Sequence, residues 1–365
     1  MSLEDQVSEK AKEIHTDGYP MSIGEVISMY RDEDIDIHPE FQRIFRWNIE
    51  QKSRLIESIL LKIPIPPIFV SQRKDGVWDV IDGVQRLSTI LEFIGVYRDE
   101  ERRLRPPSTL EGTEYLPDLA GYTWAVGEKV FSDVMQRDFK RAKIEFRIIA
   151  KQSDANAKYD MFQRLNSGTQ LSLQEARNCL LVMLNVDMFN EVVRLAANPS
   201  FLSTVPLSDA KESESYRQEL VLRFFMHASY QGRREQLDKE FGDYLTEWMR
   251  SASVAYDTDE SRVESGKFER TFSLLDRTLG EDTFRRFDGS GSRHLGGFSI
   301  ACFEFVTAGV VVNLKRWMDD PAGLRDRIRN IWSSPEFKDN SGTGVSPRRR
   351  VPRLILGART YFSRA

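Results

Sequence analysis

The chain has 365 residues, 40% of them hydrophobic and 30% charged. This length exceeds one typical hydrophobic core, so we expect a globular protein of two domains. No apolar stretch approaches the roughly 20 residues of a bilayer span, and the polar N-terminus, "MSLEDQVSEKAKEIHTDG", lacks a signal-peptide core. These features exclude a membrane protein and predict a cytoplasmic one. The net charge of −4 neither favours nor excludes a nucleic-acid partner, because charge distribution matters more than its sum.

Cysteine and histidine patterns argue against a zinc centre. Cys179 and Cys302 lie far apart in apolar surroundings, so we expect reduced core thiols. The four histidines have no metal-ligand spacing with one another or with the cysteines; they are His15, His38, His227 and His294. Neither a zinc site nor a histidine-rich HNH-type nuclease centre is expected.

The first elements predict an α/β region. Residues 21–30 have the pattern of a short amphipathic helix that starts at Ser22, and "PEFQRIFRWN" follows as an extended loop. Asn48 is a good cap for a second helix. The buried stripe of that helix is Leu55, Ile56, Ile59, Leu60 and Ile63. The prolines of "PIPPIFV" end this helix and lead into a strand.

The elements that follow continue the α/β pattern to about residue 150. "DG" at 75–76 predicts a hairpin turn into the strand "VWDVI". The helix "QRLSTILEFIGV" comes next, then a long insert of low regularity at 98–130, then the alternating strand "KIEFRIIA".

Helical periodicity dominates from Asp154 onward. "DANAKYDMFQRLNSG" predicts a helix from Asp154 to Gly168, and Ser172 with Glu175 forms the capping box of the next helix. We therefore expect an α+β protein with three parts: an α/β domain at 1–150, a helical domain at 151–340 and a basic C-terminal segment at 341–365.

Residues 80–89, "VIDGVQRLST", predict a strand-to-helix corner. Gly83 permits a sharp turn and close approach of a ligand to the main chain. The free N–H groups of a helix that begins near Gln85, with the guanidinium of Arg86, suit phosphate oxygens. Asp82 has two interpretations: an ion pair with Arg86 that holds the turn, or a ligand of Mg²⁺ that bridges to a phosphate. Spacing alone does not separate them.

Two other segments concentrate polar side chains. In "FQRIFRW", arginines alternate with aromatic residues, which fits either a solvated, anchored loop or a loop that directs Arg43 and Arg46 at a phosphate. In "FQRLNSGTQLSLQEARN", capping explains some residues but not the whole concentration, and we favour a functional role. The candidate phosphate-binding residues of the two segments are Gln42, Arg43, Arg46, Arg164, Asn166, Arg177 and Asn178.

The C-terminal stretch "SPRRRVPRLILGARTYFSRA" is strongly basic. Its six arginines, with no acid among them, fit either a solvated, partly mobile tail or a contact with a DNA backbone. The preceding "SGTGVSP" suits a loop. The candidate DNA-binding residues are Arg348, Arg349, Arg350 and Arg353.

These segments, in this order, resemble the ParB-like family that includes GmrSD-type restriction systems and SspE-type defence proteins. The motifs that carry the resemblance are "FQRIFRW", "IPIPPIFV", "DGVQRLSTI" and "MFQRLNSGTQLSLQEARN", with "LPDLAGYTW" and "RQELVLRFFMH" as further similarities. Val84 departs from the family pattern, which commonly has glutamine or lysine there. If that side chain contacts nucleotide, the activity is altered.

The resemblance implies a ParB/sulfiredoxin-like α/β head followed by an all-helical domain. It also implies nucleoside-triphosphate hydrolysis (GTP, ATP or CTP, with Mg²⁺) and a role in bacterial anti-phage defence on modified or foreign DNA. By the same resemblance, Asp82 positions metal or water, Gly83 allows close backbone approach, Gln85 orients water or phosphate, and Arg86 neutralises phosphate charge. This division of labour matches what phosphoryl transfer requires. Many relatives carry a C-terminal HNH-like nuclease domain, which this sequence does not show, so cleavage is expected from a partner chain or from the head itself.

Two other hypotheses belong to different classes. A non-enzymatic DNA-binding or regulatory module would retain the corner as a structural turn and bind DNA in a salt-dependent way. A metal-dependent DNA nickase would use Asp82 and Glu175 as metal ligands. Oligomeric state is not indicated by the sequence.

Overall fold

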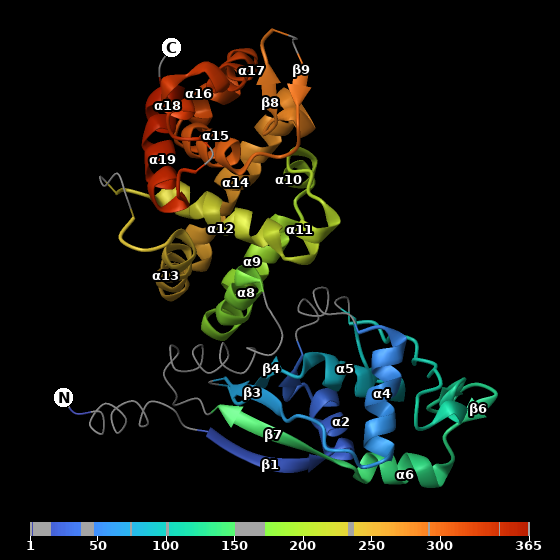
Figure 1. The fold of residues 1–365 in the computed structure, drawn as a ribbon. Coiled ribbons are helices and arrows are strands. Elements are labelled where there is room, and N and C mark those ends of the chain that lie inside the picture. Colours follow the sequence, from blue (N-terminus) through green and yellow to red (C-terminus); the bar gives the residue numbers. More distant parts are fainter. Residues whose placement is uncertain are drawn as a thin grey trace. The chain divides into compact units, whose positions relative to one another are not determined.

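The chain divides into two compact units, Met1–Leu171 and Ser172–Ala365, and each is described by itself (Figure 1). The boundary expected at residue 150 and the helix expected over 154–168 fall within 150–171, outside the described part of the chain. The computed structural model describes residues 2, 16–37, 47–73, 75–99, 102–149, 172–232, 237–290, 293–342 and 344–363.

The first unit contains a five-stranded mixed sheet with the strand order β1-β7-β3-β4-β2. Strands β3 and β7 are parallel, as are β2 and β4, while β1–β7 and β3–β4 are antiparallel. The elements of this unit are β1 (Thr16–Ser22), α2 (Ile23–Arg31), β2 (Ile35–Asp36), α4 (Ile49–Leu60), β3 (Ile68–Gln72), β4 (Trp78–Asp82), α5 (Val84–Ile94), η1 (Pro117–Leu119), β5 (Tyr122–Thr123), β6 (Lys129–Val130), α6 (Asp133–Arg141) and β7 (Lys143–Ile149).

Local chemistry explains where these elements begin and turn. Ser22 caps α2, and Asn48 forms a capping box with Gln51 at the start of α4. Gly76 adopts a positive φ of 97° in the turn between β3 and β4, as the predicted hairpin requires. The apolar faces of α2, α4 and α5 pack against one face of the sheet to form a single core.

Helix α4 ends earlier than the sequence pattern predicts. The expected buried stripe included Ile63, but the helix stops at Leu60 and Ile63 is 42% exposed. Lys62 turns into the left-handed region at φ 57°, and the N–H of Ile63 donates to the carbonyl of Ser58 to close the helix. Pro64 follows directly, so the helix cannot resume.

The low-regularity insert is fixed to α4 by buried hydrogen bonds. Glu57 accepts at Oε1 from the backbone N–H groups of Tyr115 and Leu116, at 3.0 and 3.1 Å, and from the hydroxyl of Thr113. The carboxylate thus provides acceptors for backbone N–H groups of the insert, which belong to no helix or strand that could pair them. Farther along, Trp124 packs edge-to-face on Phe93 of α5 in the core. The insert is thus an integral part of the unit.

The second unit is helical apart from the short β8–β9 ribbon. An α+β protein with a mixed head and a helical second part was predicted, and it is confirmed. The elements of this unit are α8 (Leu173–Leu184), α9 (Val186–Ala196), α10 (Pro199–Thr204), α11 (Asp209–Ser213), α12 (Tyr216–Ser229), α13 (Phe241–Val254), α14 (Thr258–Leu279), η3 (Gly280–Asp282), β8 (Arg286–Asp288), β9 (Arg293–Leu295), α15 (Ile300–Val312), α16 (Leu314–Asp319), α17 (Pro321–Asn330), η4 (Ile331–Ser333), α18 (Pro335–Lys338) and α19 (Pro347–Ser363).

The basic C-terminal stretch is a packed helix and not a tail. Helix α19 lies along α15, and Phe362 packs on Phe305 and closely approaches Gly309. Leu354 and Ile355 are also fully buried. The apolar residues between the arginines therefore form one buried stripe, which makes α19 part of the second unit's core.

In the described residues, no helix combines the length and the apolar composition of a bilayer span. Both cysteines are free thiols, and Cys302 is buried on α15, where desolvation raises its pKa.

His227 on α12 is fully buried, and neither of its ring nitrogens has a hydrogen-bond partner in the described part of the chain. Burial holds the pKa of His227 well below its usual value, and the positive charges of Arg223, Arg350 and Arg359 lower it further. The histidine is therefore neutral in the folded state, while the unfolded chain protonates it near pH 6.5.

We predict that the unfolding free energy falls below pH 6.5 because only the unfolded state gains the His227 proton. The loss is about 1.4 kcal/mol per pH unit until the depressed pKa of the folded state is reached, and it disappears above about pH 7. Urea unfolding followed by circular dichroism between pH 5 and 8 measures it. His227→Leu, which cannot titrate, should show a shallower acid loss than the parent, and equal slopes would contradict the prediction.

Candidate functional site

The corner between β4 and α5 requires a glycine at position 83. Gly83 has φ 93° and ψ 13°, which is left-handed backbone. A Cβ atom at this position would also overlap Cδ1 of Ile68 on the neighbouring strand. Both the backbone angle and the lack of space therefore disfavour a side chain here.

Arg86 folds back over Gly83 to reach Asp82. Its Nη2 lies 2.7 Å from Oδ2 of Asp82, and the two side chains are 12% and 32% exposed. Nη2 and Nε of the guanidinium lie 3.1 and 3.2 Å from the place where a Cβ of residue 83 would stand. The local ion pair proposed from the sequence is therefore present, and the glycine provides the space for it.

The N-terminus of α5 is left without a side-chain cap. Gly83, the N-cap residue, offers no side chain, and the first turn contains no acidic residue. Helices α4 and α8, in contrast, are closed by capping boxes at Asn48 and Ser172. The uncapped N–H groups of α5 and its positive dipole end attract an anion.

Gln85 joins the corner to the end of the "FQRIFRW" segment. Its Oε1 accepts a hydrogen bond of 3.2 Å from the backbone N–H of Trp47. Its Nε2 is buried and has no partner among the described residues. The structure thus places the last residue of one polar segment against the first turn of the other. Gln42, Arg43 and Arg46 lie outside the described residues.

Val84 is the residue of the corner that differs from the family pattern. Its side chain is partly buried and packs against the hydrophobic core of the first unit. Because Val84 contacts the core, an apolar residue is favoured at this position.

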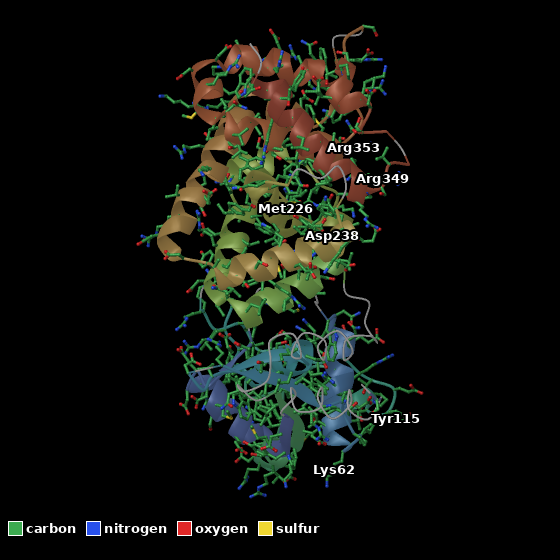
Figure 2. The ribbon with its side chains drawn as sticks, turned by 90° about the vertical axis from the view of Figure 1, so that its left-hand side faces the viewer. Lys62, Tyr115, Met226, Asp238, Arg349 and Arg353 are labelled. Carbon is green, nitrogen blue, oxygen red and sulfur yellow. The ribbon has the colours of Figure 1, made fainter. Side chains whose placement is uncertain are left out.

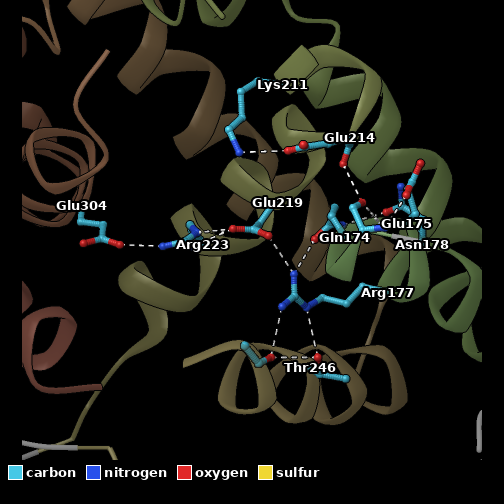
Figure 3. Close-up of polar contacts among 12 residues, drawn as sticks. Gln174, Glu175, Arg177, Asn178, Lys211, Glu214, Glu219, Arg223, Thr246 and Glu304 are labelled. Carbon is cyan, nitrogen blue, oxygen red and sulfur yellow. Dashed lines mark hydrogen bonds and ion pairs between the residues drawn. The ribbon is translucent and has the colours of Figure 1, made fainter. Parts of the chain in front are cut away.

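Arg177 of α8 has its guanidinium buried among protein partners in the second unit (Figure 3). The side chain is 3% exposed and pairs with Glu219 at 3.0 Å. It also donates to Thr246 Oγ1, to the carbonyl of Gly242 and to Gln174 Oε1. These contacts connect α8 to α12 and α13, so the structure gives Arg177 a structural role.

The other α8 candidates are also engaged locally. Asn178 accepts from Gln174 Nε2 at 2.8 Å, and Glu175 closes the predicted capping box with Ser172. Burial raises the pKa of Glu175 despite the hydrogen bonds from Ser172. Within the described ranges, no group of three or more histidine, cysteine or acidic residues could hold a metal ion. Arg164 and Asn166 lie outside those ranges.

A chain of buried ion pairs continues from Arg177 across the second unit. Glu219 also pairs with Arg223, which pairs at 2.6 Å with Glu304, and Arg350 of α19 completes the chain at Glu304. Glu304 is 0% exposed, and no other residue of the apolar helix α15 is charged. Burial raises the pKa of Glu219, but Arg223 and Arg177 together bring it below its usual value.

The four arginines predicted to bind DNA divide into two pairs. Arg348 donates to the carbonyls of Leu237 and Asp238, and Arg350 is bound to Glu304. Arg349 and Arg353 are exposed on α19, one turn apart (Figure 2). Only this second pair presents its side chains to the solvent.

Comparison with protein families identifies the first part of the chain. Residues 23–182 match the family model described as GmrSD restriction endonuclease, N-terminal domain. This part of the chain is therefore similar to GmrSD-type N-terminal domains. Comparison with curated proteins and with solved structures gives no significant match.

The matched segment contains all four motifs and ends inside α8. It therefore includes Arg177, which packs in the second compact unit. The corner brings together Asp82, Gly83, Gln85 and Arg86, while Glu175, Arg177 and Asn178 belong to the second unit. Sequence inspection missed Glu219, Arg223 and Glu304. A single acid within "IACFEFVTAGVVV" is the pattern that points to Glu304 as a buried, paired carboxylate.

Gly83→Ala tests the corner of the GmrSD-type domain. We expect a loss of about 2 to 4 kcal/mol in the unfolding free energy, because left-handed strain is added to an overlap with Ile68. Gly76→Ala is the matched control, since Gly76 has φ 97° but open space around it. Its expected cost is about 1 kcal/mol. Equal losses for the two variants in urea unfolding would contradict the steric argument.

Arg177→Met tests the structural role of the α8 motif. Removing the cation leaves Glu219 with fewer partners in a buried setting, and we expect the second unit to lose about 3 kcal/mol. Arg262→Met, at an exposed pair with Asp259, should change stability by less than about 0.5 kcal/mol. A stable Arg177→Met variant that fails to bind nucleotide would instead support a phosphate contact.

Proposed function

We propose that the chain is a nucleoside-triphosphate-binding and -hydrolysing component of a bacterial restriction or anti-phage system that acts on DNA. The observation that carries this proposal is the uncapped N-terminus of α5, with Arg86 and the unpartnered Nε2 of Gln85 beside it. The match to a GmrSD restriction endonuclease domain supports the link to DNA restriction. We expect the protein to act in the cytoplasm, where its DNA target would be.

The corner residues supply what phosphoryl transfer asks of a protein. Phosphate oxygens would accept from the first-turn N–H groups of α5, and Gly83 lets them approach the main chain. Gln85 would donate from Nε2 while its Oε1 stays bound to Trp47. Arg86 would neutralise the charge that develops on the transferred phosphoryl group.

Asp82 is the candidate residue for holding Mg²⁺. It is one carboxylate, and the remaining ligands would be phosphate oxygens and water, a common arrangement for this ion. Mg²⁺, when bound, neutralises charge on the phosphates. A phosphate at the corner competes with Asp82 for Arg86, so binding loosens the 2.7 Å pair and leaves Asp82 available.

The DNA contact is proposed for the exposed face of α19. Arg349 and Arg353 point away from the helix's buried stripe, and guanidinium groups suit phosphate oxygens. We propose that strand cleavage is carried out by a partner nuclease.

Phosphate release from GTP, ATP and CTP with Mg²⁺, with and without DNA, tests the hydrolysis. We predict that Arg86→Ala lowers kcat/KM by about 10²- to 10³-fold, the cost of one charge-stabilising donor. Gln85→Glu retains the acceptor for Trp47 but replaces the donor, so it should also slow hydrolysis. Arg54→Ala, at an exposed pair on α4, is the control and should leave the rate unchanged.

Two results would overturn the proposal. The first is no phosphate release under any condition, and the second is an Arg86→Ala variant that matches the parent. Salt-dependent DNA binding without a nucleotide requirement would then favour a regulatory DNA-binding module. Plasmid nicking that needs Mg²⁺ and is lost in Asp82→Ala would assign the corner to a nickase.

A further inference from the structure

In the first unit, the lower end of α4 lies beside α6 and the start of β7 (Figure 1). A cavity of about 740 Å³ is lined by residues of these three elements. Its floor is apolar and includes Ile59, Phe139 and Ile144. None of its lining residues belongs to the β4–α5 corner. The volume is within the range of sites that hold small ligands or short peptide segments.

Prolines leave a strand edge open at this cavity. Strand β3 begins at Ile68, opposite Phe146, whereas β7 begins three residues earlier at Lys143. The residues before Ile68 include Pro64, Pro66 and Pro67, which have no N–H to donate to a sheet. On this side, residues 143–145 therefore pair with no strand of the described chain, and they line the cavity together with Pro64 and Ile65. An open strand edge can accept an extended peptide.

The unpaired charges at the rim are positive. Lys62 and Lys143 are exposed and line the cavity, and neither has an acidic partner among the described residues. The acids of the lining are already paired, Asp138 with Arg141 at 3.9 Å and Glu145 with Arg147 at 2.6 Å. The site is therefore complementary to a negatively charged ligand.

Lys62 occupies a backbone position that favours glycine. It lies just after the end of α4 at φ 57°, in the left-handed conformation that closes the helix. Helix closure alone would be easier with glycine, which bears no strain there. Lys62 (labelled in Figure 2) is one of four non-glycine residues with a positive φ in the described chain, and its exposed side chain lines the cavity.

We propose that this cavity binds an extended peptide segment of a partner protein that carries an acidic residue next to an apolar one. The segment adds to the edge of β7 at residues 143–145. Its acidic side chain meets Lys62 and Lys143, and its apolar side chain enters between Ile59 and Ile144. Pro64 and the α4 terminus form a preformed wall, so little ordering is needed on binding.

The probe is a fluorescein-labelled, amidated hexapeptide of sequence Asp-Ile-Asp-Val-Asp-Leu, measured by fluorescence anisotropy with the full chain. We expect saturable binding that Lys62→Gly and Lys143→Ala each weaken by up to roughly fivefold, the value of one exposed charge pair. Lys62→Gly should also raise the melting temperature, because it relieves the left-handed strain while removing the charge. Lys315→Ala, an exposed lysine on α16, is the control and should bind as the parent does.

Several outcomes would overturn the proposal. They are no binding of the acidic peptide, parental affinity in both lysine variants, or equal affinity for the charge-reversed peptide Lys-Ile-Lys-Val-Lys-Leu. Octanoate offers an apolar body and a carboxylate but no strand. If it binds as tightly as the peptide and displaces it, the cavity is a site for small carboxylates and the peptide proposal fails.

Discussion

The left-handed backbone at Gly83 is the constraint on which the chemistry of the first unit depends. It turns the chain from β4 into α5 within one residue, which leaves the helix start without a cap. The missing side chain also makes room for the guanidinium of Arg86. One glycine therefore produces both an anion-attracting helix end and a cation held over it.

Asp82 and Arg86 make the corner stable in the absence of a ligand. A guanidinium at a helix N-terminus is unfavourable for the helix dipole, and the nearby carboxylate offsets this cost. Without a ligand, Arg86 is paired with Asp82. A phosphate that binds at the corner would replace Asp82 as the partner of Arg86. The structural and functional interpretations of the motif are thus compatible, because the ion pair occupies the place that a phosphate would compete for.

Sequence reasoning succeeded where the determinant is local. The caps at Ser22, Asn48 and Ser172 depend on residues within one turn, so their chemistry is readable from the sequence. It could not show the ion pair of Arg177, because the partner Glu219 lies 42 residues farther along and reaches Arg177 only through helix packing. The basic C-terminal stretch misled for a similar reason. The apolar residues of α19 form a buried stripe because the helix packs against α15. The fully buried Glu304 of α15 provides the carboxylate with which Arg350 of α19 pairs.

The buried ion pairs explain how a GmrSD-type sequence segment can end inside the second folding unit. Three arginines, Arg177, Arg223 and Arg350, surround two carboxylates, Glu219 and Glu304, so each acid has two cationic partners. Such a chain contributes little net stability compared with an apolar core, but loss of any member leaves a buried charge short of partners. Burial lowers the pKa of the neighbouring His227, and the positive charges of Arg223 and Arg350, with that of Arg359, lower it further. Arg177 therefore joins helix α8 to α12 and α13 of the second unit, although the family match includes most of α8 with the first unit.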